Sequence, residues 1–163
     1  MDETGFLDLA DELSTGSRQA SWRSATSRAY YAAFHKARTL LLRSGFTVPR
    51  AERAHSYLWL RLSNCAHPDV VYTGKALRDL NIARNHADYD VEVPVDHAEC
   101  IDHIGVAMSI IQLLHHLANE PAVLMRVLDA IKIYARCPPR SHLASVTASL
   151  PSARFDPIGQ SGM

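Results

Sequence analysis

The sequence has little cysteine, and its cysteines are scattered. Cys65, Cys100 and Cys137 are odd in number, far apart, and form no CxxC pair. Structural disulfides need paired cysteines, and cysteine-rich zinc sites usually contain closely spaced pairs. We therefore expect small buried or surface thiols, with neither a disulfide framework nor a cysteine-rich zinc site.

Long apolar runs are also absent from the sequence. No run approaches the roughly 20 residues of a membrane-spanning helix. The opening Met1-Asp2-Glu3 is acidic and lacks the basic and apolar regions of a signal peptide. The apolar fraction of 47% and the charged fraction of 21% are those of an ordinary soluble globular protein. These features predict a cytoplasmic protein with no membrane partner.

Net charge is absent too, because 17 basic residues balance 17 acidic ones. The charges are nevertheless segregated along the chain. Bases gather between Arg18 and Arg53, where Glu52 is the one acid, and acids outnumber bases between Asp69 and Asp102. The basic segment could bind a polyanion such as RNA. It could equally be a solvated helix face that pairs with the acidic segments, and both interpretations remain open.

Glycine and proline are scarce in the first 120 residues, where apolar residues recur at three- and four-residue steps. This period is typical of α-helices. Pro49 is expected to open the third helix, Asp69 to cap the fourth, and Gly45 to follow the end of the second. Asp96 and Glu99 match a capping box at the start of the fifth. The pattern predicts helices over residues 6–13, 18–44, 49–64, 69–90, 96–118 and 121–136.

No strand pattern and no internal repeat is present. The fold expected is all-α, an up-and-down bundle of about five helices over residues 1–118. Residues 119–136 would add an amphipathic helix, which either covers the end of the bundle or docks a partner. After Cys137-Pro138-Pro139 the composition turns to Ser, Ala, Pro and Gly, which predicts a flexible tail over residues 137–163.

The densest polar stretch is residues 81–90, at the end of the fourth predicted helix. Polar groups this dense at a buried helix end cost stability unless they pair with one another or bind a ligand. Arg84 falls on or beside the apolar stripe, so it either pairs with Asp88 at i, i+4 or contacts an anion. Acids are unfavourable at a helix C-terminus, so Asp88 and Asp90 should each have a basic partner. The candidate partners are Arg84, Arg28 and Lys36.

Two stretches together resemble a known family. Residues 27–38 read SRAYYAAFHKAR, and residues 84–90, about fifty positions later, read RNHADYD. This pair resembles the HEPN superfamily, most closely its small UPF0332-type proteins, over roughly residues 5–118. His55, followed by Ser56, lies where such proteins often carry His-Ser.

The resemblance implies a five-helix bundle that forms a homodimer. In active members an Arg-x(4)-His motif from each protomer meets across the interface and cleaves RNA without a metal or other cofactor. The ribose 2′-OH attacks its own phosphodiester, so an arginine that stabilises the growing negative charge and a histidine that transfers protons suit the reaction. Many members are toxins paired with a small nucleotidyltransferase antitoxin, which adenylylates a tyrosine near the motif.

This chain departs from that motif at its histidine. Tyr89 occupies the expected position, whereas His86 follows Arg84 by two residues and points roughly 200° around the helix. Proton transfer would then fall to Tyr89, with its ordinary pKa near 10, or to a histidine supplied from elsewhere, with His35 and His55 as the candidates. The resemblance thus supports an RNA-directed effector, a ribonuclease or toxin, or alternatively a non-catalytic module that binds RNA, a nucleotide or a partner protein.

The candidate site residues form three groups. The catalytic candidates are Arg84, His86, Tyr89 and His35. The candidates for contact with RNA phosphate are Arg84, Asn85, Arg28 and Lys36. Supporting positions are Asp88, Asp90, Tyr30, Tyr31 and His55. The series His97, Cys100 and His103 turns by about 60° at each three-residue step, which is too far for a shared metal site, so no metal is expected.

Overall fold

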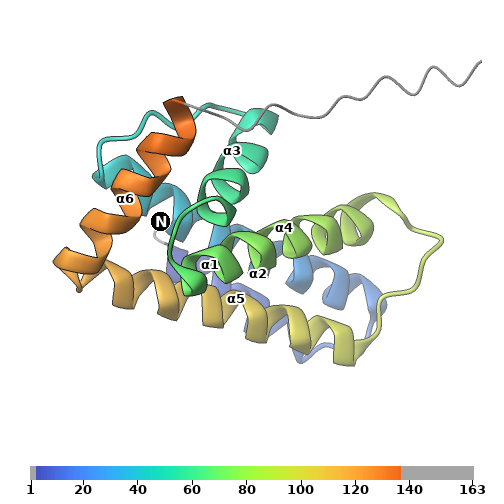
Figure 1. The fold of residues 1–163 in the computed structure, drawn as a ribbon. Helices are drawn as coiled ribbons and strands as arrows, with labels where there is room; N and C mark the ends of the chain where they lie inside the picture. Colours follow the sequence, from blue (N-terminus) through green and yellow to red (C-terminus); the bar gives the residue numbers. More distant parts are fainter. Residues whose placement is uncertain (1–2, 137–163) are drawn as a thin grey trace, which may run out of the picture.

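The computed structural model describes residues 3–136, which fold into six α-helices with no strand among them. The all-α prediction is therefore confirmed, and the predicted tail at residues 137–163 lies outside the described residues. The helices, drawn in Figure 1, are α1 (Glu3–Ser14), α2 (Gln19–Arg43), α3 (Glu52–Ser63), α4 (Pro68–Tyr89), α5 (His97–Ala118) and α6 (Pro121–Arg136).

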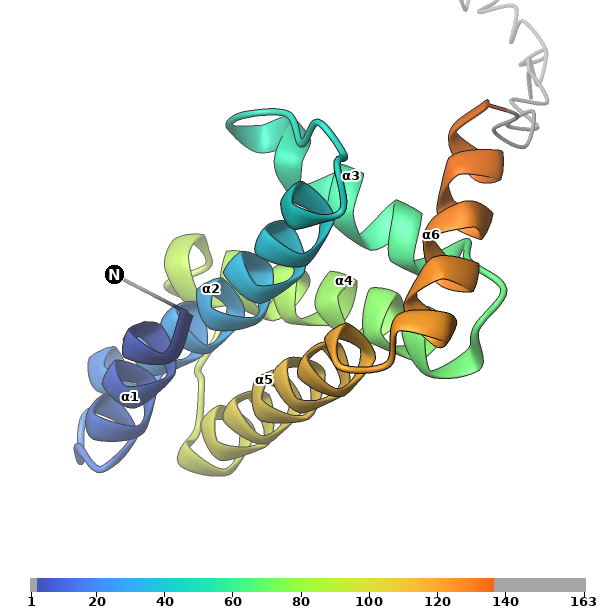
Figure 2. The ribbon, with the colours of Figure 1, turned by 90° about the vertical axis from the view of Figure 1, so that its left-hand side faces the viewer.

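Helix α2 is the centre of the bundle and packs against α1, α4 and α5 (Figure 2). Its buried face is rich in alanine, and Ala25, Ala29, Ala33 and Ala37 are all fully buried. Side chains this small let neighbouring helices approach closely, and Tyr30 of the same helix fills core space between them. Residues on α2 are therefore close to three other helices at once.

Two predicted helix ends agree with the structure. Gly45 has φ of 84°, and the amides of Gly45 and Phe46 donate to the carbonyl oxygens of Leu42 and Leu41. This is the hydrogen-bond pattern of a Schellman motif, which favours glycine because an L side chain is strained at positive φ. At the start of α5, Asp96 accepts from the Glu99 amide and Glu99 accepts from the Asp96 amide, so the capping box is confirmed.

The predicted starts of the third and fourth helices are wrong by three residues and by one residue. The third helix begins at Glu52 and not at Pro49, because the preceding segment carries Val48 into the core and Ala51 adopts φ of 54°. The fourth begins at Pro68, with His67 as its N-cap in place of Asp69. Proline suits the first helical position because its missing N–H would have no partner there.

Helices α3 and α4 approach most closely at Gly74. A Cβ atom built there would lie 2.4 Å from the backbone nitrogen of Ser63 and 2.8 Å from the carbonyl carbon of Leu62. The sequence shows Gly74 only as a weak point in a helix. The structure shows that its lack of a side chain allows the contact between the two helices.

Helix α6 lies across one end of the bundle, beside α3 and the end of α5 (Figures 1 and 2). Its residues Val127 and Ile131 are buried and belong to the same apolar cluster as the rest of the core. Within the described residues, α6 is thus packed against the bundle. Met125 and Ile133 remain exposed on its outer side.

Helix α5 is, by length and composition, the one described helix that could cross a membrane. Core helices of soluble proteins can have the same length and composition. Here α5 places Cys100, Ile104, Ala107 and Ile110 in the core of the bundle.

Candidate functional site

The end of α4 is held in place by a side chain from α2. Arg23 donates hydrogen bonds to the carbonyl oxygens of His86 at 3.1 Å and Ala87 at 3.0 Å, and to that of Asp90 at 3.1 Å. It also donates to the carbonyl oxygens of Val91 and Val93 in the connection to α5. The last carbonyls of a helix have no partner within the helix, so a cation placed there satisfies them and the helix dipole together.

Arg84, one turn before this end, faces α2. Its Nη2 donates to the Tyr31 hydroxyl at 3.1 Å and to the Tyr89 hydroxyl at 3.3 Å, and its Nη1 donates to Asn85 Oδ1 at 2.9 Å. Its Nε lies 2.7 Å from Asp88 Oδ2, although the N–H is not aligned for a hydrogen bond with that carboxylate. The guanidinium is therefore held by neighbours on both α2 and α4.

The Arg84 side chain is only 12% exposed. Burial by itself lowers the pKa of Arg84, but contacts with Tyr31, Asp88 and Tyr89 outweigh that effect and raise the pKa above its usual value. Two aromatic rings also lie close to Arg84. Its guanidinium carbon is 5.5 Å from the centre of the Tyr31 ring and 5.2 Å from the centre of the Tyr89 ring. A permanently charged group is thus positioned beside Tyr89, which is 67% exposed.

The two carboxylates at this helix end have different partners. Asp88 lies against Arg84, as predicted, and Oδ2 of Asp88 accepts a hydrogen bond of 3.2 Å from the Ser27 hydroxyl. Asp90 lies 2.7 Å from His86 Nδ1, one turn back on the same helix, and not against one of the three predicted bases. His86 is the nearest base because the two side chains share the i, i+4 spacing.

An aromatic cluster joins Arg84 to α1. Tyr31 lies near Phe6, with ring centres 6.1 Å apart, and the His35 ring stacks on Phe6 at 5.1 Å. Arg28 lies over the Tyr31 ring at 5.4 Å and over the Phe6 ring at 5.9 Å. The structure therefore brings two of the predicted phosphate-binding arginines, Arg28 and Arg84, to the same tyrosine. Lys36 follows on the same helix and is half-buried.

Tyr30, the other tyrosine of the pair, faces the core. It is 1% exposed and its hydroxyl contacts Nδ1 of His55 on α3. Burial raises the pKa of the Tyr30 phenol, with the neighbouring Tyr31 adding to the effect, so the hydroxyl stays protonated. Burial also lowers the pKa of His55, and Arg84 adds to that effect while Glu52 opposes it. Tyr30 and His55 are thus a neutral pair.

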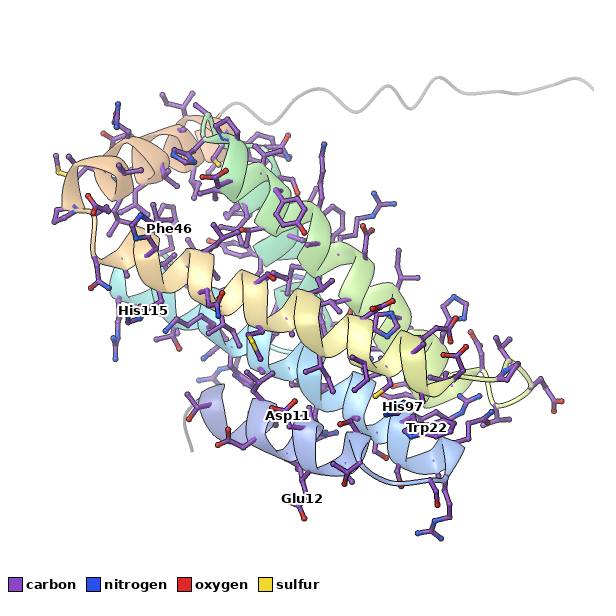
Figure 3. All side chains as sticks on the ribbon, turned by 90° about the horizontal axis from the view of Figure 1, so that it is seen from below. Asp11, Glu12, Trp22, Phe46, His97 and His115 are labelled. Carbon is purple, nitrogen blue, oxygen red and sulfur yellow. The ribbon has the colours of Figure 1, made fainter. Side chains whose placement is uncertain are left out.

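The remaining candidate histidines are not gathered with Arg84. His86 lines a cavity between α4 and α5, as the 200° rotation from Arg84 predicts, and His103 lines that same cavity. His97 packs against Trp22 at 5.6 Å, the two labelled side by side in Figure 3, and Cys100 is buried in the core. No group of three or more metal-ligand side chains occurs in the part of the chain that the structure describes.

Sequence reasoning missed two members of this site. Arg23 belongs to the basic segment, but no motif marks it, since its partners are backbone carbonyls 63 or more positions away. Phe6 begins the first predicted helix, over residues 6–13, and no motif marks its contact with His35. The one general signal for Arg23 is that the last carbonyls of any helix need donors from outside the helix, which a basic residue can supply.

One comparison with known proteins identifies a family. The family model for the HEPN domain matches residues 6–117, which include α2, α4 and the whole Arg84 cluster. Neither the curated proteins nor the solved structures gave a significant match. HEPN domains are associated with ribonuclease toxins and defence systems, and the family in general suggests RNA or antitoxin partners. Since the match covers well over half of its length, the chain belongs to the HEPN domain family.

Proposed function

We propose that this protein is an RNA-directed HEPN effector, acting as a homodimer in the cytoplasm, in which Arg84 contacts an RNA phosphate. The observation that carries the proposal is the position of the Arg84 guanidinium. It is fixed by Tyr31 and Asp88 and lies next to the exposed hydroxyl of Tyr89. A cation fixed before the ligand arrives stabilises an anionic transition state without reorganising. The small UPF0332-type proteins remain the subgroup that the motif resembles most.

Cleavage of RNA by such a site needs a proton acceptor for the 2′-OH and a donor for the leaving oxygen. His35 is the candidate histidine that shares the cluster, because its ring lies 6.2 Å from that of Tyr31, which binds Arg84. His86 is turned toward α5 and pairs with Asp90. A homodimer would place a second copy of the Arg84 cluster opposite the first and double the positive charge on one phosphate.

A specific observation also favours a second function, a non-catalytic module that binds RNA, a nucleotide or a partner protein. The Arg84 side chain is 12% exposed, and its contacts are with two tyrosines, an asparagine and an aspartate of its own chain. In this case the cluster orders α2 against α4, and Arg84 contributes mainly to stability.

The two functions are separated by one substitution with a matched control. The native protein and the variant Arg84→Ala are each incubated with total RNA. The control is Arg78→Ala, because Arg78 is an exposed arginine of the same helix that lies over the Trp59 ring. If the protein is an effector, the native protein and Arg78→Ala should cleave RNA and Arg84→Ala should not. Expression of the native protein should then inhibit growth. Intact RNA and harmless expression of the native protein would exclude the ribonuclease. A lower Tm of Arg84→Ala with unchanged RNA binding would support the second function.

We further propose a nucleotidyltransferase antitoxin as a partner, with Tyr89 as its target. Tyr89 is 67% exposed, so its hydroxyl can reach another enzyme, and an added adenylyl group would lie directly over Arg84. Incubation with a neighbouring-gene nucleotidyltransferase and ATP should add one adenylyl mass to the protein. Tyr89→Phe should abolish the addition, whereas Tyr72→Phe, also exposed on α4, should not. An unmodified Tyr89 would remove this partner from consideration.

A further inference from the structure

A second positively charged site adjoins the Arg84 cluster. A cavity of about 250 Å³ lies between the second half of α2 and the start of α3. Figure 2 shows the connection between these two helices. Its lining includes Tyr31, Phe34, His35, Arg38, Arg50 and His55. Tyr31 therefore borders this cavity and also binds Arg84 through its hydroxyl.

The polar side chains that line the cavity are basic or aromatic, and the remaining lining residues are Phe34, Pro49, Ala51 and Ala54. Arg38 reaches it from α2, Arg50 from the connection, and His35 and His55 from the two helices, while no carboxylate lines it. Glu52, in the first turn of α3, does not line the cavity, although its charge acts on His55. Two permanently charged arginines from separate segments, Arg38 and Arg50, thus border one concave surface, an arrangement that favours an anion.

The backbone of α3 adds further donors at the same place. Ala51, which also lines the cavity, is the N-cap of α3 and offers no side chain to the first amides of the helix. It adopts φ of 54°, a conformation that costs an alanine free energy and that persists only where the surrounding structure imposes it. The amides at the start of a helix and the positive end of its dipole favour a bound anion.

His55 lines this cavity and can offer it a hydrogen-bond donor. The buried Tyr30 phenol keeps its proton, and when it donates that proton to Nδ1 of His55, Nδ1 acts as the acceptor. In the neutral ring the proton consequently resides on Nε2, the nitrogen that Tyr30 leaves available. The buried contact with Tyr30 thus selects the tautomer of a residue that lines the cavity.

We propose that this cavity is a phosphate-binding site, built by Arg38, Arg50, His55 and the start of α3. The inference rests on the proposed function and deepens it. The phosphate would belong either to the RNA strand, one or more nucleotides along from the phosphate at Arg84, or to a free nucleotide. Tyr31 borders this cavity and binds Arg84 through its hydroxyl, so it connects the two proposed phosphate positions.

Inorganic phosphate tests the cavity without RNA. The native protein is titrated with phosphate at constant ionic strength, with chloride as the comparison, while backbone amide resonances are followed by NMR. The amides of Glu52 and Arg53 and the ring of His55 should shift with phosphate only. Arg38→Gln combined with Arg50→Gln should weaken this binding by at least tenfold, since charge-assisted hydrogen bonds are lost.

A charge-matched control distinguishes phosphate binding in the cavity from non-specific attraction of phosphate to a basic surface. Arg43→Gln combined with Arg78→Gln removes the same two charges from exposed positions of α2 and α4 that do not line the cavity. This variant should bind phosphate as the native protein does. Equal weakening by both double variants, or no phosphate-specific shift in the native protein, would overturn the site. Arg38→Lys keeps the charge and should retain part of the binding if the first variant proves unstable.

Two measurements identify the source of the phosphate: the salt dependence of RNA binding, and competition between a nucleotide and inorganic phosphate. If RNA supplies it, the Arg38–Arg50 double variant should bind single-stranded RNA with a salt slope reduced by about one for each lost contact. If a free nucleotide supplies it, adenosine monophosphate should compete with phosphate, and the RNA slope should stay unchanged. Because the phosphate shifts should persist in Arg84→Ala, failure of the cavity and failure of RNA cleavage are distinguishable.

Discussion

Arg23 on α2 donates a 3.0 Å hydrogen bond to the carbonyl oxygen of Ala87, 64 residues away at the end of α4. The same guanidinium reaches four further carbonyl oxygens between His86 and Val93. A single side chain therefore fixes where α4 ends and where the connection to α5 begins. Tyr89 and Asp88, which contact Arg84, lie on the segment that it holds.

Arg23→Met should loosen the end of α4. Four of the five Arg23 hydrogen bonds are exposed, so water can partly replace the lost donor, and the change is expected to cost about 0.5–1.5 kcal/mol of stability. Arg18→Met, an exposed change at the N-cap of the same helix, is the control. Chemical denaturation measures the loss, and hydrogen exchange should accelerate at residues 86–90 in the Arg23 variant. Unchanged exchange there would show that the helix end holds without Arg23.

Gly74→Ala should destabilise the protein although alanine is the better helix former. Helix propensity favours the change by about 1 kcal/mol, but the new Cβ would lie 2.4 Å from the Ser63 nitrogen. Forcing the backbones of α3 and α4 apart is expected to cost about 1–3 kcal/mol, which outweighs that gain.

Gly105→Ala provides the matched comparison for Gly74→Ala. A Cβ at Gly105 on α5 would meet nothing within 4 Å, so this variant should gain stability from helix propensity alone. The Tm values of the two variants should therefore move in opposite directions. A stabilised Gly74→Ala protein would mean that α3 and α4 can separate without loss.

Ile131→Ala tests whether α6 is part of the folded unit. Ile131 is fully buried in the common core, so the change should cost about 2–5 kcal/mol. Ile133→Ala, at a position 65% exposed on the same helix, should be nearly neutral. A single unfolding transition that shifts only for Ile131→Ala would join α6 to the bundle. Two transitions would instead make the helix a separate unit, in line with a boundary near residue 118.

Stability should fall as the pH drops below the usual histidine pKa of 6.5. Burial lowers the pKa of both His55 and His103, so the unfolded chain binds more protons between 6.5 and the lower folded values. The stabilisation is complete above 6.5 and is lost as the pH falls through that window. At pH values below the pKa values of the folded state, these two histidines no longer make the stability depend on pH.

Substitution identifies the residues behind this pH dependence. Denaturation midpoints measured between pH 7.5 and 5, a range set about the usual histidine pKa, should decline less steeply in His103→Asn than in the native protein. His116→Gln, at an exposed position, is the control. Parallel declines in all three proteins would assign the effect to other groups. His55→Gln should also flatten the profile and, in addition, disturb the contact with Tyr30.

The sequence by itself determined the helices and several of their ends. Periodic apolar residues predicted all six segments, and local chemistry predicted the Schellman glycine at Gly45 and the capping box of Asp96 and Glu99. The pairing of Arg84 with Asp88 was one of the alternatives that the sequence left open, since four residues bring two side chains together on any helix. These features depend on neighbours within one or two helical turns, which is why the sequence contains them.

Tertiary structure alone decided which distant groups meet. The contact of Arg23 with the end of α4, the pairing of Tyr30 with His55, and the close approach at Gly74 each join segments that no local pattern relates. The third helix also starts at Glu52 and not at the predicted Pro49, because burial of Val48 holds the preceding chain against the core. Packing of one helix on another is a property of the whole bundle, so the basic cavity beside Tyr31 appears only once α2 and α3 are in place.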